Sequence, residues 1–134
     1  MLCAAARLGV CRVSARASAA SRAASASAAP PAPPKKCWLL TYKYVPDILE
    51  RREPFRDAHL AAARKQVEAG NMLVAGAFTD PTDGAAFVFT PKASRAGIEA
   101  FVAADPYVTA GLVTDHSCRE WAVPVLHPGV DALV

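Results

Sequence analysis

Apolar and polar positions follow two different periods between residues 37 and 125, and the points where the period changes divide this segment into elements. Residues 37–45 are rich in β-branched and aromatic side chains and stop at Pro46, which predicts a strand followed by a turn. Residues 55–69 show helical spacing and end at Gly70, which predicts a first helix. The apolar positions of that helix are Leu60, Ala63 and Val67.

The second half of this segment again alternates strands and a helix. Residues 72–78 are apolar throughout and predict a buried strand, and turn-forming residues at 79–84 join it to a strand at 85–90. Ser94 stands where it would cap a second helix that runs to about residue 103. Residues 113–123 supply the last strand, so the order of elements is βαββαβ.

This order predicts an α+β fold of the ferredoxin-like kind, an antiparallel sheet that carries both helices on one face. Trp38 or its neighbours, together with Trp121, would make the other face apolar. We therefore expect a second copy to cover that face and form a homodimer with a dimeric α+β barrel. The same topology brings the start of the first helix and the end of the second helix to one edge of the molecule.

The formal charge of the 134-residue chain, +3, is the sum of two unlike segments. Residues 1–36 contain six basic residues and no acidic ones, which leaves 9 basic and 12 acidic residues, a net charge of −3, in residues 37–134. A mildly acidic domain does not favour nucleic acid as a partner. No stretch approaches the roughly 18 consecutive apolar residues of a membrane span, so we expect no membrane partner either.

The first segment has the composition of an organellar transit peptide. It consists mainly of Ala, Ser, Arg and Pro, and its spaced arginines leave no apolar core for a secretory signal. We expect residues 1–36 to be a leader that directs the chain to the mitochondrion, with the plastid or a disordered tail without an address as the alternatives. The domain would then span 37–125, followed by a C-terminal tail at 126–134.

Two residues with acid–base chemistry are predicted to meet at the shared edge. His59 lies one turn into the first helix, and Asp105 follows the second helix. A neighbouring carboxylate fixes the tautomer of an imidazole and suits it to proton transfer near neutral pH. Each residue also has a structural interpretation: His59 as a polar residue at the border of the helix, and Asp105 as the cap of a short helix that begins at Pro106.

Four short segments resemble the YCII-related (YciI-like) family. They are Leu-Glu-Arg-Arg at 49–52, Arg-Asp-Ala-His-Leu at 56–60, Leu-Val-Ala-Gly at 73–76 and Ala-Asp-Pro-Tyr-Val-Thr-Ala-Gly at 104–111. The resemblance implies a dimeric ferredoxin-like barrel whose pocket holds a His and an Asp as a catalytic pair, at the positions of His59 and Asp105. It also implies proton abstraction or elimination on a small cyclic substrate.

Three further residues are candidates for substrate binding. Arg56 lies one helical turn before the candidate histidine, where it would clamp an anionic substrate or pair with Asp57 or Glu53 on the surface. Tyr107 would point its hydroxyl into the pocket or pack in the core. His116, on the last strand, would line the same cavity or serve a structural role.

Metal and cofactor sites are not predicted. The three histidines lack the spacing of metal ligands, no Cys-x-x-Cys pair is present, and the glycines are too scattered for a phosphate-binding loop. Cys37 and Cys118 lie on strands that neighbour each other in this topology, where two buried thiols are favoured over a disulfide.

Two functions stay open on the sequence alone. In the first, the protein is a small enzyme in which His59 acts as general acid or base and Asp105 orients it. In the second, it is a non-catalytic dimeric module that binds a small molecule or serves as a subunit surface, and His59 is replaceable without a biochemical effect.

Overall fold

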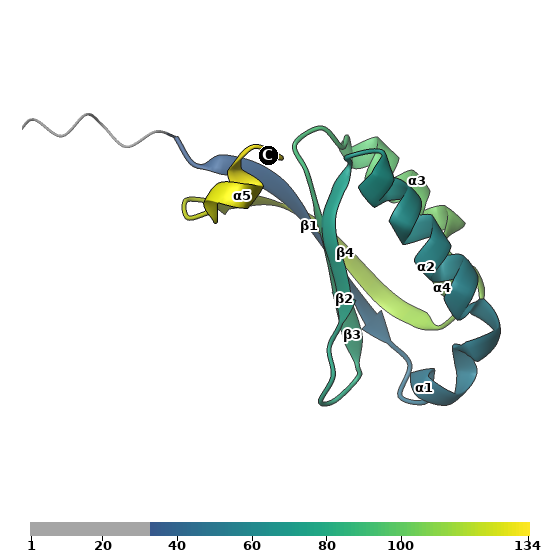
Figure 1. Ribbon diagram of the computed structural model, residues 1–134. Helices are drawn as coiled ribbons and strands as arrows, with labels where there is room; N and C mark the ends of the chain where they lie inside the picture. The colour runs from purple at the N-terminus through teal and green to yellow at the C-terminus, as the bar shows by residue number, and fades with distance from the viewer. Residues whose placement is uncertain (1–32) are drawn as a thin grey trace, which may run out of the picture. The chain divides into compact units, whose positions relative to one another are not determined.

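The first strand lies inside the sheet, between two neighbours. The strands are β1 (Lys35–Tyr44), β2 (Met72–Ala77), β3 (Gly84–Phe89) and β4 (Val113–Val123). In a computed structural model that describes residues 33–134, they pair in the order β2-β3-β1-β4, and every pair is antiparallel (Figure 1). This is the predicted ferredoxin-like arrangement. The leader predicted at 1–36 lies outside the described residues except for its last four positions, and Lys35 and Lys36 open β1.

The helices are α1 (Ile48–Arg51), α2 (Glu53–Glu68), α3 (Arg95–Ala104), α4 (Pro106–Thr109) and α5 (Pro128–Asp131). The two long helices, α2 and α3, lie on one side of the sheet (Figure 1). The predicted ends of these helices hold: Gly70 follows α2 with a φ of 71°, and the Ser94 hydroxyl accepts a hydrogen bond from the Gly97 amide at 3.0 Å. Helix α1 was not predicted from the sequence. Its Ile48 side chain is buried and packs in the core.

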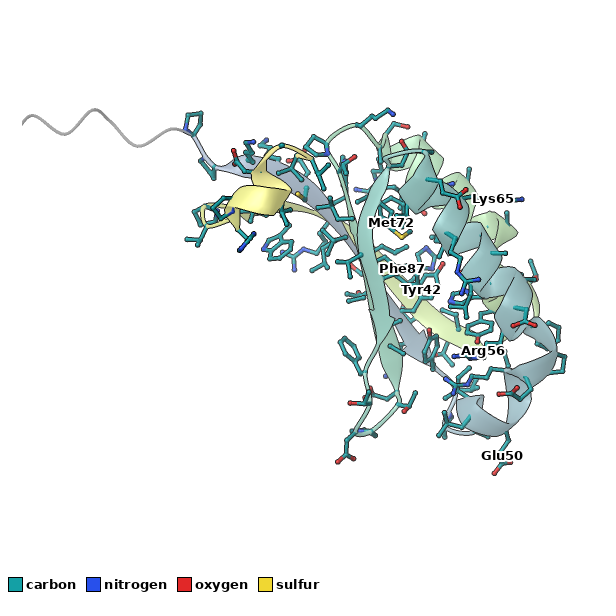
Figure 2. The ribbon with its side chains drawn as sticks, viewed as in Figure 1. Tyr42, Glu50, Arg56, Lys65, Met72 and Phe87 are labelled. Carbon is teal, nitrogen blue, oxygen red and sulfur yellow. The ribbon has the colours of Figure 1, made fainter. Side chains whose placement is uncertain are left out.

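The core fills the space between the sheet and the helices. Alternate residues of β1, Leu40, Tyr42 and Tyr44, face the helices and are buried. Phe87 and Phe89 of β3 lie beside them, and Figure 2 shows Tyr42 and Phe87 in this layer. Aromatic rings therefore dominate the interior at the point where α2 crosses the sheet.

Strand β2 is not the buried strand that its composition predicts. Only Met72 is buried, whereas Val74 is 58% exposed. The reason is topological, because β2 is an edge strand with β3 as its single neighbour. On α2, similarly, Val67 is 47% exposed and does not belong to the apolar face that its spacing predicts.

The opposite face of the sheet carries an apolar surface. It is formed by Leu39, Val74, Phe78, Val88 and Trp121, which alternation places away from the helices. Trp121 and Phe78 are 44% and 50% exposed. Trp38 is not part of this surface, because it pairs with the buried Phe89 on the helix side.

The C-terminal residues and the cysteines have defined places. Lys35 of β1 pairs with Asp131 of α5 at 3.1 Å, and the Gly129 amide donates to His127 Nδ1 at 3.1 Å. Cys37 and Cys118 are free buried thiols, as expected. Cys118 lies opposite Leu40 and Cys37 does not share that face, so adjacent strands hold the two sulfurs on opposite sides of the sheet. No helix within 33–134 has both the length and the apolar character to cross a membrane.

Candidate active site

His59 and Asp105 meet in the interior, which confirms the contact that the topology predicts. His59 Nδ1 lies 2.8 Å from Asp105 Oδ1 and 3.0 Å from Oδ2. Helix α2 supplies the histidine, and the junction of α3 and α4 supplies the carboxylate. His59 is 6% exposed and Asp105 is 0% exposed, so the pair is withdrawn from water.

The Asp105 carboxylate accepts hydrogen bonds from three separate elements. Besides His59, the Tyr107 amide donates to Oδ1 at 2.9 Å, and the Tyr42 hydroxyl donates to Oδ2 at 3.2 Å. Asp105 is therefore both the cap of α4 and the partner of the histidine, and its two sequence interpretations hold together. With three donors, both oxygens of this buried carboxylate have hydrogen-bond partners.

This arrangement sets the orientation of the imidazole. Because a carboxylate only accepts, the neutral His59 ring carries its proton on Nδ1, and Nε2 is the nitrogen with a free lone pair. No residue within 33–134 forms a hydrogen bond with Nε2. The ring is thus positioned by one nitrogen and available for chemistry at the other.

Two aromatic rings pack against the same imidazole. Tyr107 stacks on His59 with a centroid distance of 4.0 Å and an interplanar angle of 4°. The Phe87 ring meets it edge-on at 6.1 Å and 82°. Tyr107 is 4% exposed and packs in the core, so the core alternative of the sequence analysis describes most of its side chain.

A cavity of about 160 Å³ opens beside this pair, between α2 and the β2–β3 hairpin. Its lining combines the predicted Arg56, His59 and Tyr107 with Tyr44 and Arg52, and small side chains of β2 form the opposite wall. Figure 2 shows Arg56 at the end of the helix layer nearest α1. Three of the five predicted site residues therefore border one cavity, and Asp105 lies directly behind His59.

Burial keeps the tyrosines of this region protonated. The pKa of Tyr42 is raised, first by burial and then by the nearby charge of Asp105. Burial also raises the pKa of Tyr44 and of Tyr107, and Arg52 opposes both shifts. The hydroxyls therefore stay protonated at physiological pH and add no negative charge to the cavity, while each can donate or accept a hydrogen bond.

The structure places His116 outside this cavity. It pairs with Tyr42 in the register of β1 and β4, and because Tyr42 faces the helices, His116 faces the same side of the sheet. Its Nε2 lies 3.5 Å from Glu99 of α3, in an exposed pair at the β4 edge. The cavity borders β2 and β3, at the opposite edge of the sheet from β4, so His116 lies on the same face as the cavity but too far across the sheet to line it.

The sequence did not predict three residues of the site: Tyr42, Tyr44 and Arg52. The alternation of β1 contains a clue, since Tyr42 and Tyr44 share the face of the buried Leu40 near the end of the strand. Arg52 precedes Arg56 by one helical turn, a spacing that becomes visible only when the helical region is extended back to α1.

Comparisons with known proteins agree with this fold. The family model for the YCII-related domain matches residues 37–122. A search of curated proteins gave no match. Among solved structures, the 5-chloro-2-hydroxyhydroquinone dehydrochlorinase from Burkholderia phenoliruptrix AC1100, in complex with 2,5-dihydroxybenzoquinone, is similar with a TM-score of 0.54 and 22% identity. The similarity covers 63% of this chain and 92% of that one, and it supports the fold.

Proposed function

The chain belongs to the YCII-related domain family, and within that family we propose that it is a small enzyme that moves a proton on a cyclic or acidic metabolite. The observation that carries this proposal is the buried His59–Asp105 contact beside a cavity of about 160 Å³. A histidine that merely bordered a helix would need neither a buried anion at 2.8 Å nor a parallel aromatic ring.

The proposed chemistry uses His59 Nε2 as the base. Nε2 takes a proton from a C–H bond of the ligand, and the electron pair of that bond passes to the adjacent carbon framework. Asp105 stabilises the resulting imidazolium through Nδ1–H. The imidazolium then returns the proton at another atom, which gives isomerisation, or the electron pair expels a leaving group, which gives elimination.

Two observations support this reaction: the burial of the His59–Asp105 pair and the ligand of the similar solved structure. The low exposure of both partners strengthens their electrostatic interaction relative to water. The similar solved structure is named as a dehydrochlorinase and holds a ligand with one six-membered ring. An elimination-type reaction on a ring of that size is the counterpart that we propose for this chain.

Solvent-exchange measurements on a panel of candidate compounds test the proposal. Purified protein is incubated in D₂O with small cyclic acids, lactones and hydroxyquinones, and loss of C–H signals is followed by proton NMR. We expect at least one compound to exchange with the native protein, and exchange to fall by at least about 10²-fold in His59→Gln. His116→Gln is the matched control and should retain full exchange.

A second outcome assigns the alternative function. If a compound binds the native protein with unchanged affinity in His59→Gln and no exchange occurs in either, the chain is the non-catalytic binding module and the proton-transfer proposal is wrong. Asp105→Asn adds a further separation: if it only lowers the folded fraction, Asp105 serves α4 alone.

The assembly that we propose is a homodimer through the apolar face of the sheet. Leu39, Val74, Phe78, Val88 and Trp121 form a surface of the kind that a second copy would cover. Light scattering on the purified protein should give twice the chain mass, and Val74→Lys should shift it toward one chain mass. A native protein with a single chain mass would overturn this assembly.

For its location, we propose that residues 1–36 direct the chain to the mitochondrion, on the strength of their spaced arginines and lack of acidic residues. A fluorescent fusion of the full chain should colocalise with a mitochondrial marker, and replacement of Arg7, Arg12, Arg16 and Arg22 by Gln should abolish this. Plastid or diffuse fluorescence of the native fusion would contradict the address.

A further inference from the structure

Two guanidinium groups border the cavity without a carboxylate partner. Arg52 Nε is buried and has no hydrogen-bond partner among the described residues. Neither Arg52 nor Arg56 takes part in an ion pair within residues 33–134, so the surface pair of Arg56 with Asp57 or Glu53, one of its two sequence interpretations, is not formed. A buried, unpaired donor on a cation is costly unless a ligand supplies the acceptor.

The helical backbone places the Arg52 and Arg56 side chains at the same cavity. Arg52 stands at the junction of α1 and α2 with a φ of −75° and a ψ of −22°, so the helical path continues through it. Arg56 follows after four residues and His59 after seven, which puts the three side chains on one face of the helix. All three line the same cavity.

The other polar groups of the cavity do not balance this charge. The carboxylate behind His59 already accepts from three donors. Tyr44 and Tyr107 hold their protons, because burial raises the pKa of both hydroxyls. The cavity therefore presents two cations and several donors, and its described lining lacks a free anion.

From this geometry we propose that Arg52 acts with Arg56 to bind an ionised oxygen group, so that the site takes a single-ring organic anion. The size fits, since a cavity of about 150 Å³ accommodates one benzene ring in another protein and this one measures about 160 Å³. The inference rests on the proposed function, for which it names the substrate class. Arg52 is then a specificity-determining residue that holds the ring with a carbon next to His59.

Benzoate and its neutral analogue benzamide test the charge requirement. Calorimetric titration of the full chain should show benzoate binding at least about tenfold more tightly than benzamide, because an ionised acceptor strengthens the hydrogen bonds. Arg52→Met should weaken benzoate binding by at least about tenfold and leave benzamide unchanged. Arg52→Lys should recover only part of the loss, since an ammonium lacks the planar fork.

Arg64→Met is the matched control. Arg64 lies exposed on the same helix and does not line the cavity, so this variant removes the same charge and should bind benzoate as the native protein does. Thermal unfolding without ligand should show Arg52→Met at least as stable as the native protein, because it deletes an unpaired buried donor. That result separates a binding defect from a folding defect.

The inference is overturned if native protein does not bind benzoate at millimolar concentration, if benzamide binds equally well, or if Arg52→Met binds benzoate with native affinity. The proposed function fails on a different observation. In that case, Arg52→Met would weaken benzoate binding and leave benzamide binding unchanged as predicted, while His59→Gln would retain native solvent exchange.

Discussion

Two histidines of this chain each lie beside a carboxylate, yet their surroundings differ in almost every respect. His59 is buried, 2.8 Å from an aspartate that two further donors hold in place. His116 lies at the sheet edge, 3.5 Å from Glu99, and both side chains are about two-fifths exposed. One histidine borders a cavity and the other borders solvent.

The contrast shows what turns a histidine–carboxylate contact into a candidate site. At the edge, water screens the charges and both side chains keep much of their freedom, so the contact contributes little. In the interior, the carboxylate is fixed by the α4 cap and by Tyr42, and the imidazole is fixed by the carboxylate and Tyr107. Burial of the carboxylate without hydrogen-bond partners would destabilise the fold. Here, both Asp105 oxygens accept hydrogen bonds.

The largest difference between the two regions should come from removing the acid. Asp105→Ala deletes the acceptor of three hydrogen bonds and the cap of α4, and it should lower the free energy of unfolding by roughly 3–5 kcal/mol. Glu99→Ala, the matched variant in the exposed pair, should change it by less than about 0.5 kcal/mol. Urea titration measures both, and comparable losses would erase the contrast.

Alkaline pH should destabilise the interior next most strongly. The folded-state pKa values of Tyr42 and Tyr44 are raised above 10.0, so the unfolded chain loses these protons first and stability falls as pH rises from about 10. Between pH 10 and 11 the loss should be about 1 kcal/mol for each tyrosine. The Tyr42→Phe/Tyr44→Phe double variant should show a correspondingly flatter profile in urea titrations at both pH values, and an unchanged slope would contradict the raised pKa values.

A smaller effect should distinguish the two tyrosines at neutral pH. Tyr42→Phe removes one hydrogen bond to Asp105 and should cost about 1 kcal/mol of unfolding free energy. Tyr44→Phe, on the same strand and the same face, removes a hydroxyl that no described residue bonds and should cost less than about 0.5 kcal/mol. Equal effects in thermal unfolding would mean that the Tyr42 hydroxyl does not support the carboxylate.

The smallest predicted effect concerns the exposed pair itself. His116→Gln should change the unfolding free energy by less than about 0.5 kcal/mol at low salt, and this difference should vanish in about 1 M NaCl because exposed charges are screened. A salt-independent loss, measured by urea titration at the two salt concentrations, would show that His116 has a packing role that its exposure does not suggest.

Topology made the central contact predictable from the sequence. A βαββαβ order fixes the directions of the helices, so the start of one helix and the end of the other had to share an edge, where His59 and Asp105 meet. The fold followed from the same pattern, because strands and helices of this chain differ clearly in period. The N-cap at Ser94 and the helix end at Gly70 depend on neighbouring residues alone, so they too could be predicted from the sequence.

Tertiary surroundings were not readable in the same way. An apolar run does not reveal whether a strand lies at the centre or the edge, and the prediction that β2 is buried was therefore wrong. The position of His116 on the last strand did not reveal that β4 is the edge strand farthest from the cavity, which borders β2 and β3. The place of Arg52 depends on α1, a single turn too short to show a period.

The tautomer of His59 tests the central claim most directly. Histidine-selective ¹⁵N NMR, assigned with His59→Gln, His116→Gln and His127→Gln, reports which ring nitrogen carries the proton when the imidazole is neutral. The structure predicts that Nδ1 of His59 is protonated and donates to Asp105, that Nε2 is free, and that Asp105→Asn disturbs this pattern without affecting His116. A neutral His59 with its proton on Nε2 would contradict the claim that Asp105 prepares this ring to accept a proton from a ligand in the cavity.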